Sequence, residues 1–176
     1  MDQKIIRKFK FFTAWNDDRE EAWLSDMSRQ GLHLHSLGFP GKYYFTIGKP
    51  REDIYRLDFI VDRKDYQDYL QLFHDAGWEH MGEMGGWQYF RTPKQEYQVP
   101  EIYTDNASKA QKYFRLLVFL MIFFPIYIVM ISRQVPGEGN LEDFITAVRF
   151  ILGLLLILYT YAIIRITGRI IQLKKK

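Results

Sequence analysis

The four histidines are the side chains of this sequence that could bind a metal ion through nitrogen. His33 and His35 are two positions apart in a stretch that alternates like a strand, so their side chains would share a face. A zinc site needs a third ligand that converges on the same point. The internal repeat described below places Glu79, not His80, opposite His33, and His74 falls on a separate helix. We therefore expect solvent-facing histidines, and no metal or other cofactor.

Motifs for catalysis are not found in this sequence. It contains no GxSxG, P-loop, HExxH or dinucleotide-binding pattern, and its lack of cysteine excludes a cysteine nucleophile and disulfides. Asp17, Asp18, Glu20 and Glu21 form an acidic cluster, which the start of a helix explains because acids there complement the helix dipole. The sequence predicts no catalytic residues and a protein that is not an enzyme. It also has no basic helix that would read DNA, so we expect no direct nucleic-acid binding.

A charged strand is the first candidate binding surface. The side chains of residues 54–62 alternate, so Arg56, Asp58 and Asp62 would face away from the apolar side chains of the same strand. Those apolar side chains, which would pack under helices, are Tyr55, Leu57, Phe59 and Val61. Two interpretations stay open. The charged face could be an exposed surface whose ion pairs contribute little to stability, or it could be a docking face for a charged partner.

Aromatic residues are the second candidate, because they make up 17% of the chain and are too many for one small core. Some could line a cleft between two halves of the domain and bind an apolar or amphipathic ligand. Core packing is the alternative for each of them. Tyr43 and Tyr44 are neighbours on a predicted strand, so only one of the two can face the core. The candidate cleft residues are Trp15, Tyr43, Tyr44, Trp78, Trp87 and Tyr89.

Two helix patterns recur at a fixed spacing along the first hundred residues. They cover residues 17–30 and 63–76, and each ends at a glycine that suits the end of a helix. The apolar face of the first helix would hold Ala22, Trp23, Met27 and Leu24, and that of the second would hold Tyr66, Tyr69, Leu70 and Phe73. The spacing is 46 positions, because Trp23, Leu24, Met27, Gly31 and Leu32 correspond to Tyr69, Leu70, Phe73, Gly77 and Trp78.

Strands surround each helix in the same order. Residues 4–12 and 54–62 supply the strand before each helix, and residues 32–48 and 78–91 supply a strand pair after it. The predicted fold is therefore α+β. It consists of duplicated βαββ units that form one mostly antiparallel sheet with two helices on one face.

Two apolar runs follow this domain, and each is long enough to cross a bilayer. The predicted spans are residues 113–132 and residues 144–164, which would form a two-helix transmembrane hairpin. The second span contains Arg149. This side chain either reaches the outer interface, where it can pair with Glu142 or Asp143, or is a functional charge within the membrane.

Basic residues flank the two spans on one side. Lys109, Lys112 and Arg115 precede the first span, and Arg165 and Arg169 follow the second with three terminal lysines. The turn that connects the spans is acidic on balance. The positive-inside rule therefore places both termini in the cytoplasm and the protein in the inner membrane. The predicted organisation is a cytoplasmic domain at 1–98, a linker at 99–112, the hairpin at 113–164 and a basic tail at 165–176.

An uncharacterised bacterial family resembles this chain over residues 3–95. The resemblance is carried by the segments WLSDMSRQGLHLHSLGFPGKYYFT, DIYRLDF and YLQLFHDAGWEHMGEMGGWQYFRT. The family is classed as domain of unknown function 2812. Its members combine a soluble domain with hydrophobic segments and are often encoded beside PadR-type transcriptional regulators. The resemblance implies a regulatory setting with a PadR-type regulator as a cytoplasmic partner, and it implies no catalytic residues.

These observations favour a membrane-anchored cytoplasmic interaction or sensor module that is regulatory and non-enzymatic. The alternative is a binding module for an apolar or amphipathic small molecule, which would use the aromatic cleft. A membrane-associated enzyme acting on a lipid-soluble substrate is the third and least favoured possibility, since it would need a converging set of acids, histidines and arginines.

Overall fold

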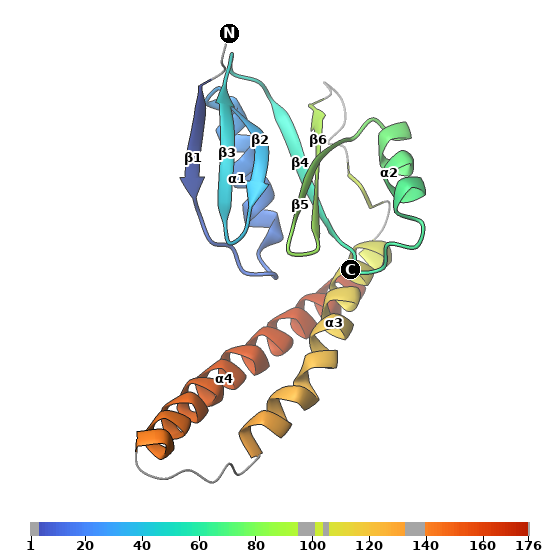
Figure 1. Ribbon diagram of the computed structural model, residues 1–176. Coiled ribbons are helices and arrows are strands. Elements are labelled where there is room, and N and C mark those ends of the chain that lie inside the picture. The colour runs from blue at the N-terminus through green and yellow to red at the C-terminus, as the bar shows by residue number, and fades with distance from the viewer. Residues whose placement is uncertain (1–3, 95–100, 104–105, 133–139, 176) are drawn as a thin grey trace.

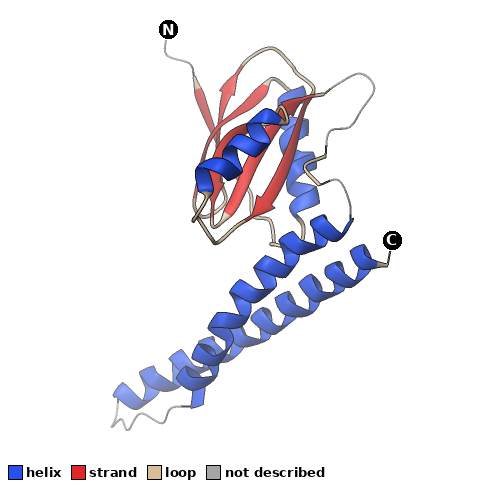
Figure 2. Cartoon of the chain, turned by 90° about the vertical axis from the view of Figure 1, so that its right-hand side faces the viewer, coloured by secondary structure: helices blue, strands red, loops and turns tan. Residues whose placement is uncertain are grey.

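The computed structural model describes residues 4–94, 101–103, 106–132 and 140–175. The described residues form six strands and four helices. The strands and the first two helices make up a domain, and the two long helices extend away from it (Figure 1, Figure 2). The first half of the domain contains β1 (Ile5–Phe9), α1 (Asp17–Arg29), β2 (Leu32–Gly38) and β3 (Lys42–Ile47). The second half contains β4 (Asp53–Phe59), α2 (Tyr66–Asp75), β5 (Glu79–Met84) and β6 (Trp87–Pro93). The long helices are α3 (Asn106–Ser132) and α4 (Asn140–Lys174).

The duplication predicted from the 46-residue spacing is confirmed in detail. Each half is a three-stranded antiparallel sheet, with the order β1-β3-β2 in the first and β4-β6-β5 in the second. The pairing register shifts between Leu34 and Ser36 in β2, and it shifts again between His80 and Gly82 in β5, at the corresponding positions. The glycines after the two helices, Gly31 and Gly77, have φ angles of 78° and 82°, a backbone conformation that favours glycine.

The six strands divide between two sheets rather than forming one, and the two helices lie on opposite faces of the second sheet. Tyr89 of β6 packs with Leu24 of α1, whereas its neighbour Phe90 packs with Phe73 of α2. Neighbouring residues of a strand point to opposite faces, so the second sheet is covered on both sides. The Glu21 side chain explains part of this arrangement, because its Oε1 accepts the Leu57 N–H at 2.9 Å and so brings α1 to the edge strand β4.

The main core lies where α1 meets both sheets. Leu24 and Met27 are the buried apolar residues of α1, Trp23 is half-buried and Ala22 is exposed, so the helix face is rotated from the predicted one. The other buried members come from both halves, namely Leu34, Tyr43, Phe45, Tyr55, Leu57 and Tyr89. On α2 the predicted face is confirmed: Phe73 is buried, and Tyr69 and Leu70 pack beside it. Each half of the repeat therefore contributes to one shared core.

Helices α3 and α4 are long and apolar enough to cross a membrane, and most of their apolar side chains are exposed. Their ends nearest the domain pack onto it. Tyr113 and Leu116 of α3, together with Ile166 and Ile170 of α4, form a buried cluster with Phe59 of β4. Helix α3 includes residues 106–112 of the predicted linker, and α4 includes most of the predicted tail. The predicted outer turn covers residues 133–143, of which residues 140–143 belong to α4 instead. Residues 133–139 and the terminal residue 176 lie outside the described residues.

Candidate functional site

A cavity of about 570 Å³ lies between the two halves of the domain and against α4. Its walls come from the connection between β1 and α1, the turn between β2 and β3, and the turn between β5 and β6. Leu158 and Tyr161 of α4 close one side. The lining is mostly aromatic and comprises Phe11, Phe12, Trp15, Phe39, Tyr43, Trp87, Tyr89 and Tyr161. A space of this size, with apolar walls and a few polar groups, is typical of a small-molecule site.

Four of the six residues predicted for an aromatic cleft line this cavity, namely Trp15, Tyr43, Trp87 and Tyr89. Tyr44 does not, because it follows Tyr43 on β3 and therefore faces the other way, where its ring lies beside Gly38. Trp78 does not either, since it is buried in the α2 cluster with Phe73 and Phe90. The structure therefore brings four of the six residues together at one cavity and places Tyr44 and Trp78 elsewhere.

Two carboxylates, Asp17 and Glu20, lie in the lining of the cavity beside the aromatic rings. Glu20 is only 6% exposed. Its Oε1 accepts one hydrogen bond from Tyr43 at 2.6 Å and another from Tyr89 at 2.5 Å, so each half of the repeat supplies one donor. Burial raises the pKa of Glu20, while the two tyrosine hydrogen bonds act in the opposite direction. Burial and the Glu20 charge also raise the pKa values of both tyrosines, so their hydroxyls remain proton donors.

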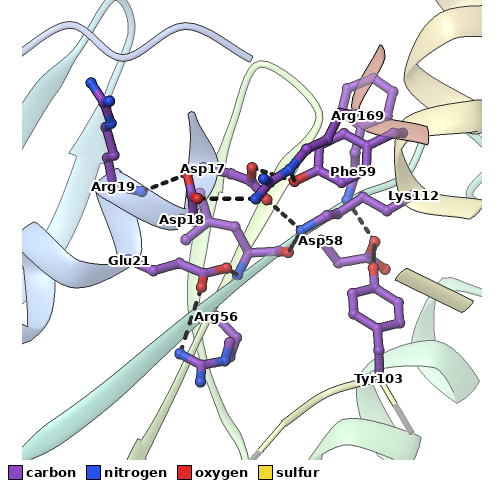
Figure 3. Close-up of polar contacts among 12 residues, drawn as sticks. Asp17, Asp18, Arg19, Glu21, Arg56, Asp58, Phe59, Tyr103, Lys112 and Arg169 are labelled. Atoms are coloured by element: carbon purple, nitrogen blue, oxygen red, sulfur yellow. Dashed lines mark hydrogen bonds and ion pairs between the residues drawn. The ribbon is translucent and has the colours of Figure 1, made fainter. Parts of the chain in front are cut away.

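The second carboxylate, Asp17, belongs to a buried polar contact between the domain and α3. We call Asp17, Lys112 and Tyr113 the polar joint, of which Figure 3 labels Asp17 and Lys112. Lys112 donates to Asp17 Oδ2 and to the Leu57 carbonyl oxygen, the latter at 2.9 Å, and Tyr113 donates to Asp17 Oδ1 at 2.6 Å. Asp17 is 2% exposed and Lys112 is 1% exposed. The joint is thus a desolvated ion pair whose charges satisfy one another.

Two further ion pairs surround the polar joint. Arg169 of α4 contacts Asp18 at 2.9 Å, and Arg115 of α3 contacts Asp58 of β4 and donates to the Phe59 carbonyl oxygen at 2.8 Å. Three of the basic residues that the sequence assigns to membrane topology therefore bind acids of the domain. The cavity and the joint share Asp17, so the lining of the cavity is connected directly to α3.

The predicted docking face is not one exposed surface. Asp58 is 3% exposed and accepts hydrogen bonds from Tyr69 at 3.0 Å, from Tyr103 and from Arg115, so it is not open to a partner. Arg56 pairs with Glu101 at 2.7 Å and lies 3.5 Å from Glu21. Asp62 is exposed beyond the end of β4. Asp58 is buried although strand alternation points it away from Tyr55 and Leu57, because that second face is also covered, by Tyr69 of α2 and by Tyr103.

The acidic cluster at the start of α1 does more than complement the helix dipole, because most of it is buried in the domain. Asp17, Glu20 and Glu21 are buried, and only Asp18 of the four faces solvent. The sequence could have predicted this burial from the spacing to Leu24. The three acids precede Leu24 by three, four and seven positions, and such positions share one face of a helix. Burial raises the pKa of Glu21 from 4.5 to about 7, in spite of the nearby charges of Lys112 and Arg56.

The histidines are spread over the domain. His33 Nε2 lies 2.9 Å from the Lys49 carbonyl oxygen, and His80 Nε2 lies 2.9 Å from Gln88 Oε1. His35 and His74 are exposed. Within residues 4–94 and the other described segments, no three histidine or acidic side chains converge as metal ligands would.

The chain belongs to the family described as protein of unknown function (DUF2812), whose profile matches residues 16–125. The match begins at the residue before α1 and continues through about three-quarters of α3, so it contains both sides of the polar joint. The match confirms the resemblance over residues 16–95 and extends it into α3, and residues 3–15 lie outside it. Comparison with curated proteins and with solved structures finds no match.

Proposed function

We propose that this protein is a membrane-anchored sensor module that binds an amphipathic small molecule in the cavity between its two βαββ halves. The observation that carries the proposal is the composition of that cavity. Aromatic rings from both halves line it together with Leu158 and Tyr161 of α4. A ligand there would contact the domain and an apolar helix at once, which is the arrangement a sensor at a membrane surface needs.

The polar joint supports the regulatory part of this proposal. A ligand that changes the position of Asp17 or Glu20 changes the surroundings of Lys112 and Tyr113, which lie on α3. Coupling between the cavity and α3 requires that the protein have two conformations, and that these bind the ligand with different affinities. The resulting change in the domain is proposed to alter its binding to a cytoplasmic partner. The family resemblance suggests that this partner is a PadR-type regulator.

Binding can be tested with the full chain in phosphatidylcholine nanodiscs and the fluorescent apolar probe N-phenyl-1-naphthylamine. Phe11 and Phe39 line the cavity but are largely exposed, so replacing both with alanine should leave the fold intact. We expect this double variant to bind the probe at least fivefold more weakly than the wild type. The matched control replaces Phe9 and Leu72, which are exposed and lie outside the cavity, and it should bind normally. Equal binding by both double variants would contradict the proposal.

The membrane topology is part of the same proposal. We propose that α3 and α4 cross the inner membrane as a hairpin with both termini in the cytoplasm. The engagement of Lys112, Arg115 and Arg169 with the domain supports this orientation, because it places these charges on the domain side of the helices. Reporter fusions after residue 108 and at residue 176 should read cytoplasmic, and a fusion within residues 137–140 should read external. An external signal from residue 176 would contradict the two-span arrangement.

A further inference from the structure

The cavity has an acceptor that the protein leaves unused. Both tyrosine hydroxyls that bind Glu20 donate to Oε1, and no side chain among the described residues donates to Oε2. The other lining carboxylate differs, because both oxygens of Asp17 are taken by Lys112 and Tyr113. Glu20 is therefore a buried carboxylate in the wall of the cavity with one oxygen available to a ligand.

The surroundings of Glu20 suit a positive charge. Aromatic faces attract cations through the ring quadrupole, and the cavity is lined by the rings of both Glu20 partners and by Trp87. The protein itself provides an example at the cavity wall: Lys10 Nζ lies 5.1 Å from the ring centre of Phe12 and 4.8 Å from that of Trp23. In the part of the chain that the structure describes, Lys10 is the only cationic residue of the lining, which also holds two carboxylates.

We infer that the ligand of this cavity is an amphipathic organic amine, bound in its protonated form. Its ammonium group donates to Glu20 Oε2 and lies against the neighbouring aromatic faces, and its apolar part occupies the space lined by Trp15, Leu158 and Tyr161. An anionic ligand would meet the Glu20 carboxylate in a largely buried site, and the like charges disfavour it. A neutral ligand would supply no charge to pair with the buried Glu20 carboxylate. This inference rests on the proposed function and specifies its ligand class.

Three probes of equal chain length test the assignment, namely octylamine, 1-octanol and octanoate. At pH 8 the amine carries a positive charge and the acid a negative one, as alkylamines and carboxylic acids do. The full chain is placed in phosphatidylcholine nanodiscs, and binding is measured by titration calorimetry with empty nanodiscs subtracted. We expect octylamine to bind at least tenfold more tightly than octanol, and octanoate to bind more weakly than octanol.

A pair of variants then assigns the preference to one carboxylate. Glu20→Gln keeps an oxygen for the two tyrosines and should reduce octylamine affinity to that of octanol, without changing octanol affinity. Glu21→Gln is the matched control, because Glu21 is the adjacent buried acid of α1 but does not line the cavity. It should retain the tenfold preference for the amine.

The outcomes separate this inference from the function on which it rests. Equal binding of octylamine and octanol by the wild type would overturn the amine assignment. A preference that survives Glu20→Gln would overturn the assignment of that preference to Glu20. Either result leaves the amphipathic cavity standing. A lack of binding by all three probes would overturn the cavity function itself. The comparison of probes on the wild type needs no substitution, so it decides the question even if Glu20→Gln unfolds.

Discussion

Lys112 and Asp17 form an ion pair that is almost completely removed from water, and they come from helices that are distant in the sequence. Breaking such a pair on one side leaves an uncompensated buried charge, which is destabilising by roughly 3–5 kcal/mol. Replacing both partners with uncharged groups of similar size removes the desolvation penalty together with the attraction. We therefore expect replacement of one partner to be more destabilising than replacement of both.

Lys112→Met should lower the free energy of unfolding by about 3–5 kcal/mol. The double variant Asp17→Asn with Lys112→Met should recover most of that loss, since the introduced amide oxygen can still accept a hydrogen bond from the Tyr113 hydroxyl. Thermal unfolding of the full chain in nanodiscs measures both effects. Lys174→Met, which removes an exposed charge near the end of α4, is the control and should change little. A double variant as unstable as Lys112→Met would mean that the ion pair is not the cause.

Glu21 makes stability depend on pH in a direction opposite to that of most carboxylates. Its pKa rises from 4.5 to about 7, first because of burial, so the folded state holds a proton that the unfolded state releases. Stability associated with this residue is therefore present at low pH and is lost as the pH rises from 4.5 through about 7. The shift corresponds to a loss of about 3 kcal/mol.

Glu21→Gln should remove this pH dependence while keeping an acceptor for the Leu57 N–H. Relative to the wild type, the variant should gain about 3 kcal/mol between pH 5 and pH 8, with the change complete near pH 8. Paired chemical or thermal unfolding curves at several pH values give the difference directly. Parallel pH profiles for the two proteins would show that Glu21 does not titrate between folded and unfolded states.

At the scale of elements, the spacing of the internal repeat predicted the helices and strands correctly. The 46-residue correspondence predicted both helices, both hairpins and the glycine after each helix. It did not predict which face of a strand would be covered, because that depends on elements elsewhere in the chain. In β6, Gln88, Tyr89 and Phe90 are buried in succession, and a strand that is covered on both faces loses its alternating pattern. The same limit explains why Asp58 was expected to be exposed.

Helix α1 provides the test of the core at this scale. Leu24 is fully buried among residues of both sheets, and Leu72 of α2 is 68% exposed. Leu24→Ala should lower the free energy of unfolding by about 2–5 kcal/mol, as truncation of a packed leucine does. Leu72→Ala deletes the same atoms from an exposed position and should change stability by about 0.5 kcal/mol or less. Similar losses for the two variants would contradict the assignment of the helix face.

At the scale of the whole molecule, the sequence predicted the parts but not how they meet. Lys112, Arg115 and Arg169 flank apolar runs, and the positive-inside rule is a sufficient local reason for basic residues there. Asp17 and Asp18 begin a helix, and the helix dipole is a sufficient local reason for acids there. Nothing local indicates that these bases bind acids of the domain, since Lys112 and Arg169 lie 95 and 151 positions from Asp17 and Asp18, and Arg115 lies 57 positions from Asp58. The aromatic cavity was predicted in part, and its acids and its α4 wall were not.

The joint also affects whether residues 1–98, the predicted cytoplasmic domain, fold without the two long helices. This fragment keeps both βαββ units and most of the main core, so it should be soluble and unfold cooperatively. It lacks Lys112, Tyr113 and the rest of α3, so Phe59 and Trp87 lose part of their cover. We therefore expect the fragment to unfold at a lower temperature than the full chain. An aggregated fragment under all mild conditions would contradict the boundary at residue 98.

Asp17→Asn, made in both the fragment and the full chain, separates the effect of the joint from that of the lost core. In the full chain the substitution leaves Lys112 buried without its counter-charge, so it should cost roughly 3–5 kcal/mol. In the fragment Asp17 has no buried partner and only its interaction with the helix start remains, so the same substitution should cost less than about 1 kcal/mol. Unfolding free energies of the four proteins measure this difference. An equal cost in both backgrounds would mean that Asp17 stabilises the domain by itself, and that the apolar contacts alone hold α3 against it.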